Sequence, residues 1–281
     1  GLTFETSGVT TGADRQFGDS FSFGLAGGLA QDRTLVGHRG SRNDSRAHAA
    51  AGYGSFHPSS SPFFVNVMHG HQRLSFQLRR FSPSGGAAAA GAGGAGAQAL
   101  AASIQPLAAD DGDLLDSERT GGQDFSSLGA GYRYKAKAWT FTSYGRQDDV
   151  RTRLDAYTEP SNVPGALHYD AQSMRTRTSI LGLRIDGTRE IRWGTLLPKF
   201  KVELQGDNDD QGEVAVRYAD EPDGPVFRTR PRNMDNRRVA MEVGATLVTR
   251  HFLTLRLEYH AVLGGLFGND NALVFSFEKE H

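Results

Sequence analysis

Ser20 and the histidine pair His69 and His71 are the residues whose types and spacing most resemble a reactive or metal-binding site. Ser20 follows Asp19 directly. A serine becomes a nucleophile only beside a base, and the sequence places no His/Asp partner to activate it. His69 and His71 would share one face of a strand, where two imidazoles could contact a metal ion, but no third ligand is evident. We therefore predict no catalytic residue and no metal site, and interpret the histidines as structural side chains of a lumen or an interface.

Two further segments match ligand-binding motifs incompletely. Residues 91–96 spell G-x-G-x-x-G, but they follow no predicted strand and lie in low-complexity sequence, so they do not indicate a dinucleotide site. The acidic segment 207–212 resembles the start of a calcium-binding loop. The twelfth position of that loop is Tyr218, which lacks the bidentate carboxylate that such loops need. We expect a solvated acidic loop there, with weak calcium binding as the alternative, and no cofactor.

The composition excludes several classes of protein. Lys and Arg number 31 and Asp and Glu number 32, so the net charge of −1 gives no general attraction to nucleic acid, and we expect no nucleic-acid partner. The absence of cysteine excludes disulfides and thiolate metal sites. Hydrophobic residues make up only 38%, and no run of about 18 apolar residues predicts a transmembrane helix. A membrane-spanning β-barrel remains compatible with this composition, because its strands alternate apolar and polar residues.

Alternation of apolar and polar residues is the strongest pattern in the chain. It is clearest in segments 196–204, 238–247 and 253–260, where helical spacing does not fit. A tilted strand needs about 9 to 11 residues to cross a bilayer, and these segments, with 8 to 10 residues, are close to that length. The same pattern, richer in glycine, predicts further strands, and the complete set of eleven is 8–17, 20–31, 45–57, 62–80, 125–135, 137–147, 172–187, 196–204, 238–247, 253–260 and 271–279.

The connections between these segments alternate in length. Short turns are expected around residues 18–19, 57–62, 135–137, 188–194 and 249–251. Longer polar loops are expected at 32–44, 81–124, 148–171, 206–236 and 264–270. Short turns at one end and long loops at the other are typical of outer-membrane barrels, whereas a soluble sandwich shows no such alternation. We therefore predict an all-β fold, an antiparallel transmembrane outer-membrane β-barrel of about 12 strands with a hydrated polar lumen.

The two faces of the C-terminal strands differ in charge, which predicts the face that lies in lipid. A charged side chain facing lipid near the midplane costs roughly 2 to 4 kcal/mol. We therefore expect the charged set to line the lumen, namely Lys199, Lys201, Glu203, Arg238, Glu242, Arg256 and Glu258. The expected lipid-facing set is Phe200, Val202, Val243, Leu255 and Leu257. The alternative is an ordinary half-buried sheet with these charges exposed to water.

Aromatic residues lie near several predicted strand ends. At such positions their amphipathic rings fit the girdles at the lipid boundary better than a ligand cage. The residues concerned are Phe63, Phe64, Trp139, Trp193, Phe252 and Tyr259.

A low-complexity insertion interrupts what we predict to be a single domain over residues 1–281. Residues 82–123 include Pro-Ser-Gly-Gly and an Ala/Gly tract, which buries too little apolar surface to offset the entropy of ordering. The stretch 97–107 could form a short helix, limited by Pro106. We expect a flexible loop on the extracellular side. The alternatives are a plug folded into the lumen and a partner-binding loop.

Four stretches, in order along the chain, resemble motifs of autotransporter translocator domains of the type V secretion pathway. Residues 192–200, Arg-Trp-Gly-Thr-Leu-Leu-Pro-Lys-Phe, are similar to the family's W-G-x-L-x-P-aromatic signature. Residues 7–14 resemble its early G-x-x-x-G-x-D strand, 52–56 its Y-G-S-Y strand, and 154–173 its mid-barrel loop and strand. The resemblance covers the chain apart from 82–123.

This resemblance implies a barrel of about twelve strands, through which an upstream passenger crosses to the cell surface. It also implies a first strand and a pore helix before Gly1, with residues 2–5 as the remnant of that strand. Any signal peptide is expected upstream or already removed. In this family the barrel-assembly machinery recognises the terminal strand, and Leu273, Phe275 and Phe277 fit that assembly signal. Glu278-Lys279-Glu280-His281 follow, so either His281 replaces the family's terminal aromatic residue or a short tail extends past Phe277.

The function we predict is that of a translocator that anchors in the outer membrane of a Gram-negative bacterium and helps export an N-terminal passenger. Its expected partners are outer-membrane lipid, the barrel-assembly machinery and the upstream passenger segment. The alternative is a passenger-less pore or structural scaffold barrel, with partner proteins in an outer-membrane assembly. An enzyme built on the barrel would need a nucleophile–base cluster in the wall, and none is evident in the sequence.

Overall fold

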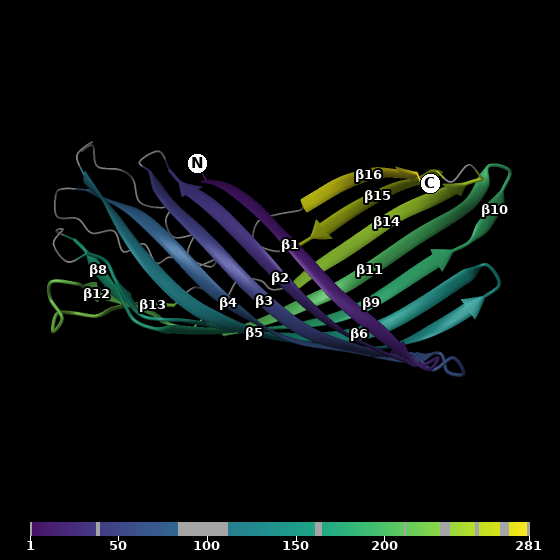
Figure 1. The fold of residues 1–281 in the computed structure, drawn as a ribbon, viewed down its shortest axis with the longest axis horizontal. Helices are drawn as coiled ribbons and strands as arrows, with labels where there is room; N and C mark the ends of the chain where they lie inside the picture. Colours follow the sequence, from purple (N-terminus) through teal and green to yellow (C-terminus); the bar gives the residue numbers. More distant parts are fainter. Residues whose placement is uncertain are drawn as a thin grey trace.

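The computed structural model consists of β-strands and their connections (Figure 1). It describes residues 2–37, 40–83, 112–160, 165–210, 212–230, 237–250, 253–264 and 270–279. The predicted short helix within 97–107 and the glycine motif at 91–96 lie outside the described residues. None of the described residues forms a helix that is long and apolar enough to cross a membrane.

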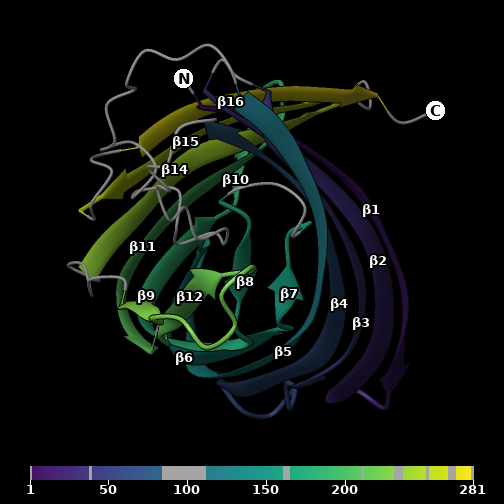
Figure 2. The same ribbon diagram turned by 90° about the vertical axis from the view of Figure 1, so that its left-hand side faces the viewer.

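Eleven long strands account for the large sheet, and all eleven were predicted from alternation. They are β1 (Leu2–Phe17), β2 (Phe21–Val36), β3 (Ser41–Phe56), β4 (Phe63–Pro83), β5 (Gly112–Ala136), β6 (Trp139–Leu154), β9 (Gln172–Gly187), β11 (Gly194–Asp210), β14 (Arg237–Thr249), β15 (Leu253–Leu263) and β16 (Asp270–Lys279). The short β10 (Arg189–Ile191) pairs with the start of β11. The long strands pair antiparallel in chain order from β1 to β16, which form the two edges. Viewed from the end, the sheet curves around a common axis (Figure 2).

Several strands extend beyond their predicted ends on the long-loop side. β4 and β5 pair from Pro83–Gly112 onward, so residues 82–83 and 112–123 belong to strands and the predicted insertion 82–123 is too wide. β11 likewise continues to Asp210, which makes most of the predicted acidic loop a strand. These extensions show no apolar alternation because neither face needs an apolar side chain there. Ladder hydrogen bonds and cross-strand ion pairs hold them, for example Arg79–Asp116 with an Nε–Oδ1 distance of 2.5 Å.

Residues 2–5 are the first residues of β1 rather than the remnant of another strand. They continue the ladder with β2, from Leu2 opposite Val36 to Glu5 opposite Arg33. The expectation drawn from the family resemblance for this segment was wrong, because uninterrupted pairing with β2 makes residues 2–17 one strand.

A second, small sheet arises from two segments that the sequence assigned to polar loops. Its strands are β7 (Tyr157–Thr158), β8 (Leu167–Tyr169), β12 (Val214–Tyr218) and β13 (Phe227–Thr229), in the order β13-β12-β8-β7. The buried cluster of this sheet consists of Tyr157, Leu167, Tyr169, Val214 and Val216, with Leu78 of β4 packed against it. The described part of the chain therefore buries its main apolar cluster here, whereas most large apolar side chains of the long strands are exposed.

Candidate functional site

The predicted lipid-facing residues share the outer face of the large sheet. Register places Phe200 opposite Val243, and Leu257 lies opposite Ala245 on the next strand. Val243 and Leu257 remain 48% and 50% exposed. Phe200, Val202 and Leu255 lie on the same face by strand alternation. The chain thus presents a broad apolar surface that other parts of the described structure do not cover.

This apolar surface forms a tilted belt around the wall, which we call the outer belt. On β2 it covers outward residues from Phe21 to Leu29, whereas on β11 it covers those from Leu196 to Leu204. Following the ladder from β2 to β11, the belt steps toward the short-turn end. Such a shift is expected when tilted, staggered strands cross one flat slab of lipid. The outer belt therefore runs obliquely across the strands.

Aromatic side chains occupy part of the turn-side edge of this belt. Phe63 and Tyr132 make an edge-on ring contact at 5.1 Å, and Trp139 is 39% exposed nearby on β6. Phe64 has the opposite orientation, because its ring covers Gly131 on the inner face and stacks on His57. Its predicted girdle position was therefore wrong. Tyr259 lies in the belt on β15, and Trp193 lies in the turn before β11, while Phe252 is outside the described residues.

The predicted lumen residues lie on the inner, concave face. Lys199, Lys201, Glu203 and Glu242 line one cavity of about 860 Å³ together with side chains from β3, β4, β5, β6 and β9. Side chains from so many consecutive strands of a curved sheet can converge only on its concave side. Arg238, Arg256 and Glu258 belong to the same inward-facing set by strand alternation, and Glu258 lies opposite Gly244.

Ion pairs and hydrogen bonds connect these inner charges. Lys199 pairs with Glu242, and Lys201 Nζ lies 3.1 Å from Glu203 Oε1. The Tyr144 hydroxyl donates a hydrogen bond of 2.5 Å to the same Glu203 oxygen. Glu203 is only 5% exposed, so these contacts compensate for the loss of water around its carboxylate. The four predicted charges at this cavity are thus paired with one another.

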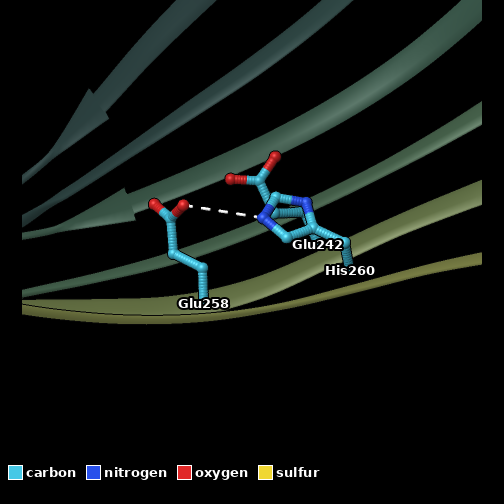
Figure 3. Close-up of side chains that lie close together, drawn as sticks. All are labelled: Glu242, Glu258 and His260. Carbon is cyan, nitrogen blue, oxygen red and sulfur yellow. Dashed lines mark ion pairs between the residues drawn. The ribbon is translucent and has the colours of Figure 1, made fainter. Parts of the chain in front are cut away.

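Glu242, Glu258 and His260 form a group whose ligand atoms all lie within 4.8 Å of one another (Figure 3). His260 Nε2 is 3.5 Å from Glu258 Oε2. Glu242 already has a cationic partner in Lys199, which reduces the attraction of the group for a metal ion. We interpret the group as part of the inner ion-pair network.

Ser20, the histidine pair and the acidic segment lie apart from one another and form no reactive site among the described residues. Ser20 lies in the turn between β1 and β2, where its carbonyl accepts a hydrogen bond from the His57 amide. His69 and His71 lie on the outer face, not in the lumen, because they share strand parity with Phe63. His71 Nδ1 contacts Asp124 Oδ1 at 2.8 Å, and His69 Nδ1 contacts Ser126. Asp207 is engaged by Thr178 and Arg238 and is therefore not a free calcium ligand.

The predicted assembly signal lies on β16 with its apolar side chains outward. Leu273, Phe275 and Phe277 are opposite Tyr259, Leu257 and Leu255 of β15, and they are 70%, 65% and 72% exposed. β16 is an edge strand of the described sheet.

The small sheet packs against the inner face near the long-loop end. Arg80 of β4 forms two hydrogen bonds with Glu159, at 2.8 and 2.5 Å, and a third with the Gly165 carbonyl. Tyr157 and Tyr169 stack with ring centroids 4.5 Å apart. Burial raises the pKa of both phenols, that of Tyr169 to about 12, so both stay protonated at neutral pH. No periodic pattern in the sequence predicted this sheet.

Glycine on the inner face makes room for aromatic rings, and Gly182 is the position where this requirement is most direct. A Cβ atom at Gly182 would clash with the ring of Tyr144, whose hydroxyl donates a hydrogen bond to Glu203. We expect Gly182→Ala to destabilise the barrel by about 1 to 3 kcal/mol, because the packed ring must shift. The measurement is the temperature at which the heat-modifiable gel band unfolds. Gly145→Ala is the control, since its Cβ would meet Leu181 at an ordinary 3.7 Å; equal unfolding temperatures for both variants would contradict this account.

Comparison with known proteins agrees with the architecture. A family model described as an autotransporter β-domain matches residues 1–260. The solved translocator domain of autotransporter NalP from Neisseria meningitidis is similar with a TM-score of 0.62 at 10% identity, covering 98% of this chain and 81% of that one. The β-domain of the Bordetella autotransporter BrkA gives a TM-score of 0.54 at 13% identity, covering 98% and 88%. No curated protein matches the chain. The similarity to these structures confirms the predicted antiparallel, all-β barrel fold class.

Proposed function

The chain belongs to the autotransporter β-domain family, and from this premise we propose that the polar inner face of its sheet is the path of an upstream passenger segment to the cell surface. The family resemblance predicted from sequence is thereby confirmed. Domains of this family are outer-membrane barrels of Gram-negative bacteria that act as translocators in type V secretion, and this chain is one of them.

The proposal rests on the difference between the polar inner face and the apolar outer face of the large sheet. The inner face surrounds a cavity of about 860 Å³ with charged side chains and hydroxyls, while the outer face is an apolar belt. An extended passenger exposes backbone N–H and C=O groups along its length, and these groups need water or polar side chains around them. Charges that are already paired on this wall, such as Lys199 with Glu242, hold a moving chain weakly. The proposed mechanism is passive, with no residue of this domain performing chemistry.

The surroundings of the barrel follow from the same division of faces. We propose that Phe200, Val202, Val243, Leu255 and Leu257 contact outer-membrane lipid. We also propose that the barrel-assembly machinery recognises Leu273, Phe275 and Phe277 on β16. The long-loop end, with the small sheet, would then face the cell exterior, as long loops do in barrels of this kind.

Site-specific photo-crosslinking tests the proposed path. A photoreactive residue replaces either Lys199 on the inner face or Val243 on the outer face, and the full-length gene product with a tagged passenger is expressed in a Gram-negative host. We expect passenger crosslinks from position 199 during export and none from position 243. The path is refuted if the passenger reaches the surface and crosslinks arise only from position 243. A gene product with no passenger at all would instead identify a stand-alone pore or scaffold.

A further inference from the structure

An apolar groove lies in the outer belt where β5 and β6 carry small side chains. It has a volume of about 690 Å³ and includes Ala130, Ser143 and Gly145, with Val65 on one side and Leu181 on the other. Register places Val65, Ala130, Gly145 and Leu181 in one row across four strands, which explains why the groove is hollow between two larger side chains. Its dimensions and apolar lining suit hydrocarbon chains.

A cluster of arginines lies on the same face and the same strands, displaced toward the long-loop end. We call it the arginine cluster, and it consists of Arg73, Arg151, Arg153, Arg175 and Arg177. Two aspartates lie among them, Asp124 and Asp149, and Asp210 of β11 is opposite Arg175, so five positive charges against three negative ones leave a net charge of +2. The chain as a whole has a net charge of −1, so this concentration does not follow from composition.

The ion pairs within the cluster leave part of its positive charge available. Arg175 and Arg177 share the Asp149 carboxylate at 2.5 and 3.1 Å, and Arg153 lies 3.9 Å from Asp124. Within the described part of the chain, no carboxylate lies within ion-pair distance of Arg73 or Arg151. Both side chains are exposed.

Strand register places three of these arginines around Gly122. Arg73 on β4 and Arg153 on β6 lie on either side of Gly122, and the His71 ring lies over this glycine. Arg151 is the next outward-facing residue on β6, opposite Asp124. Guanidinium groups on neighbouring strands can each donate hydrogen bonds to the oxygens of one phosphate.

The distance between groove and arginine cluster matches one leaflet of a membrane. Gly145 and Arg151 are six residues apart on β6, so they are roughly 20 Å apart along the strand. With a strand tilt of about 40°, the height difference is roughly 15 Å, or half of a hydrocarbon core about 30 Å thick. A molecule with acyl chains in the groove would therefore hold its headgroup beside the arginines.

We propose that the outer wall of β4, β5, β6 and β9 binds a phosphorylated, multiply acylated lipid of the outer leaflet, with its acyl chains in the groove and its phosphate against the arginine cluster. The inference rests on the proposed function, because it requires the outer belt to lie in the membrane with the long loops outside. The net charge of +2 favours an anionic headgroup over a zwitterionic one.

Lipid titration of the full-length protein tests this inference. The purified protein in neutral detergent is titrated with lipid A, which is a diphosphorylated, acylated disaccharide, and bound lipid is counted by native mass spectrometry. We expect Arg73→Gln with Arg151→Gln to lower the affinity at least about tenfold, since two charge-assisted phosphate contacts are lost. Arg228→Gln with Arg230→Gln, on and beside the small sheet, removes the same charge elsewhere and should leave binding unchanged. Gly145→Leu should fill the groove and therefore also weaken binding. A Cβ atom at this position meets only ordinary van der Waals contacts, so we expect the variant to fold.

The controls separate this inference from the proposed function. Equal binding of a dephosphorylated form of the lipid, or equal loss in both double variants, would overturn the phosphate site. Equal affinity for phosphatidylglycerol would also overturn it, as this would indicate a general attraction to anionic lipid. A protein that forms a heat-modifiable barrel and enters bilayers, yet shows any of these results, contradicts the lipid site alone. A protein that enters no bilayer contradicts the proposed membrane function as well.

Discussion

Replacing Val243 with arginine is expected to prevent assembly of the barrel in the outer membrane. Val243 lies in the middle of the outer belt, between Phe200 and Tyr259 on the neighbouring strands, and is half exposed. A guanidinium at this depth costs roughly 2 to 4 kcal/mol relative to an apolar side chain. That corresponds to about a 30- to 1,000-fold loss in the ratio of inserted to uninserted chain. The measurements are the amount of protein in the outer-membrane fraction and its heat-modifiable mobility on gels.

The adjacent residue supplies a matched control. Glu242 points to the inner face and pairs with Lys199, so Glu242→Ala removes a charge from the wet side of the same strand. We expect this variant to assemble as the wild type does, because Lys199 remains hydrated. If Val243→Arg and Glu242→Ala were tolerated equally, the assignment of inner and outer faces would be wrong.

The sequence predicted the long strands wherever a membrane forces the two faces apart. Segments such as 196–204 and 253–260 alternate because one face contacts an apolar surface and the other a polar one. On the long-loop side this constraint ends, and strands continue without alternation. The segment 112–124 of β5 is an example: its strand conformation depends on pairing with β4, which sequence periodicity does not report.

The small sheet could not be predicted for a different reason. Its strands have two to five residues, which is too short for any periodic pattern. The one local signal was the buried run Val214-Ala215-Val216, in a segment otherwise rich in charge. Its partner Leu167 and the stacked tyrosines come from a loop about fifty residues earlier in the sequence. Only their pairing in space makes the apolar residues of both loops a core.

Contacts between distant parts of the sequence also determine the surroundings of the inner charges. The sequence pattern predicted that Lys199, Lys201, Glu203 and Glu242 lie on one face of the sheet, toward the lumen. The structure places all four around one cavity. The pattern could not give the hydrogen bond from Tyr144 to Glu203, because Tyr144 lies on β6, far away in the sequence. The contact from Tyr144 is what allows Glu203 to be almost fully buried.

The buried pair between Arg80 and Glu159 is where we expect the largest local effect of a single substitution. Glu159 is 3% exposed and accepts hydrogen bonds from both Arg80 nitrogens and from the Leu167 amide. Removing its carboxylate with Glu159→Ala leaves the Arg80 guanidinium buried without a counter-charge. Such a change costs about 3 to 5 kcal/mol. We expect the small sheet to detach from the inner face while the large sheet remains intact.

Hydrogen exchange resolved by segment measures this effect. In Glu159→Ala, residues 157–169 and 214–229 should lose protection, whereas the ladders of β9 and β11 should keep theirs. Glu213→Ala is the control, because Glu213 pairs with Arg228 and Arg230 on the exposed side of the same small sheet, and protection should persist. Replacing the pair together, Arg80→Met with Glu159→Leu, should restore protection, since an apolar pair of similar volume avoids the unpaired charge. Full protection in Glu159→Ala alone would mean that the stacked tyrosines, rather than the ion pair, hold this sheet over the passage.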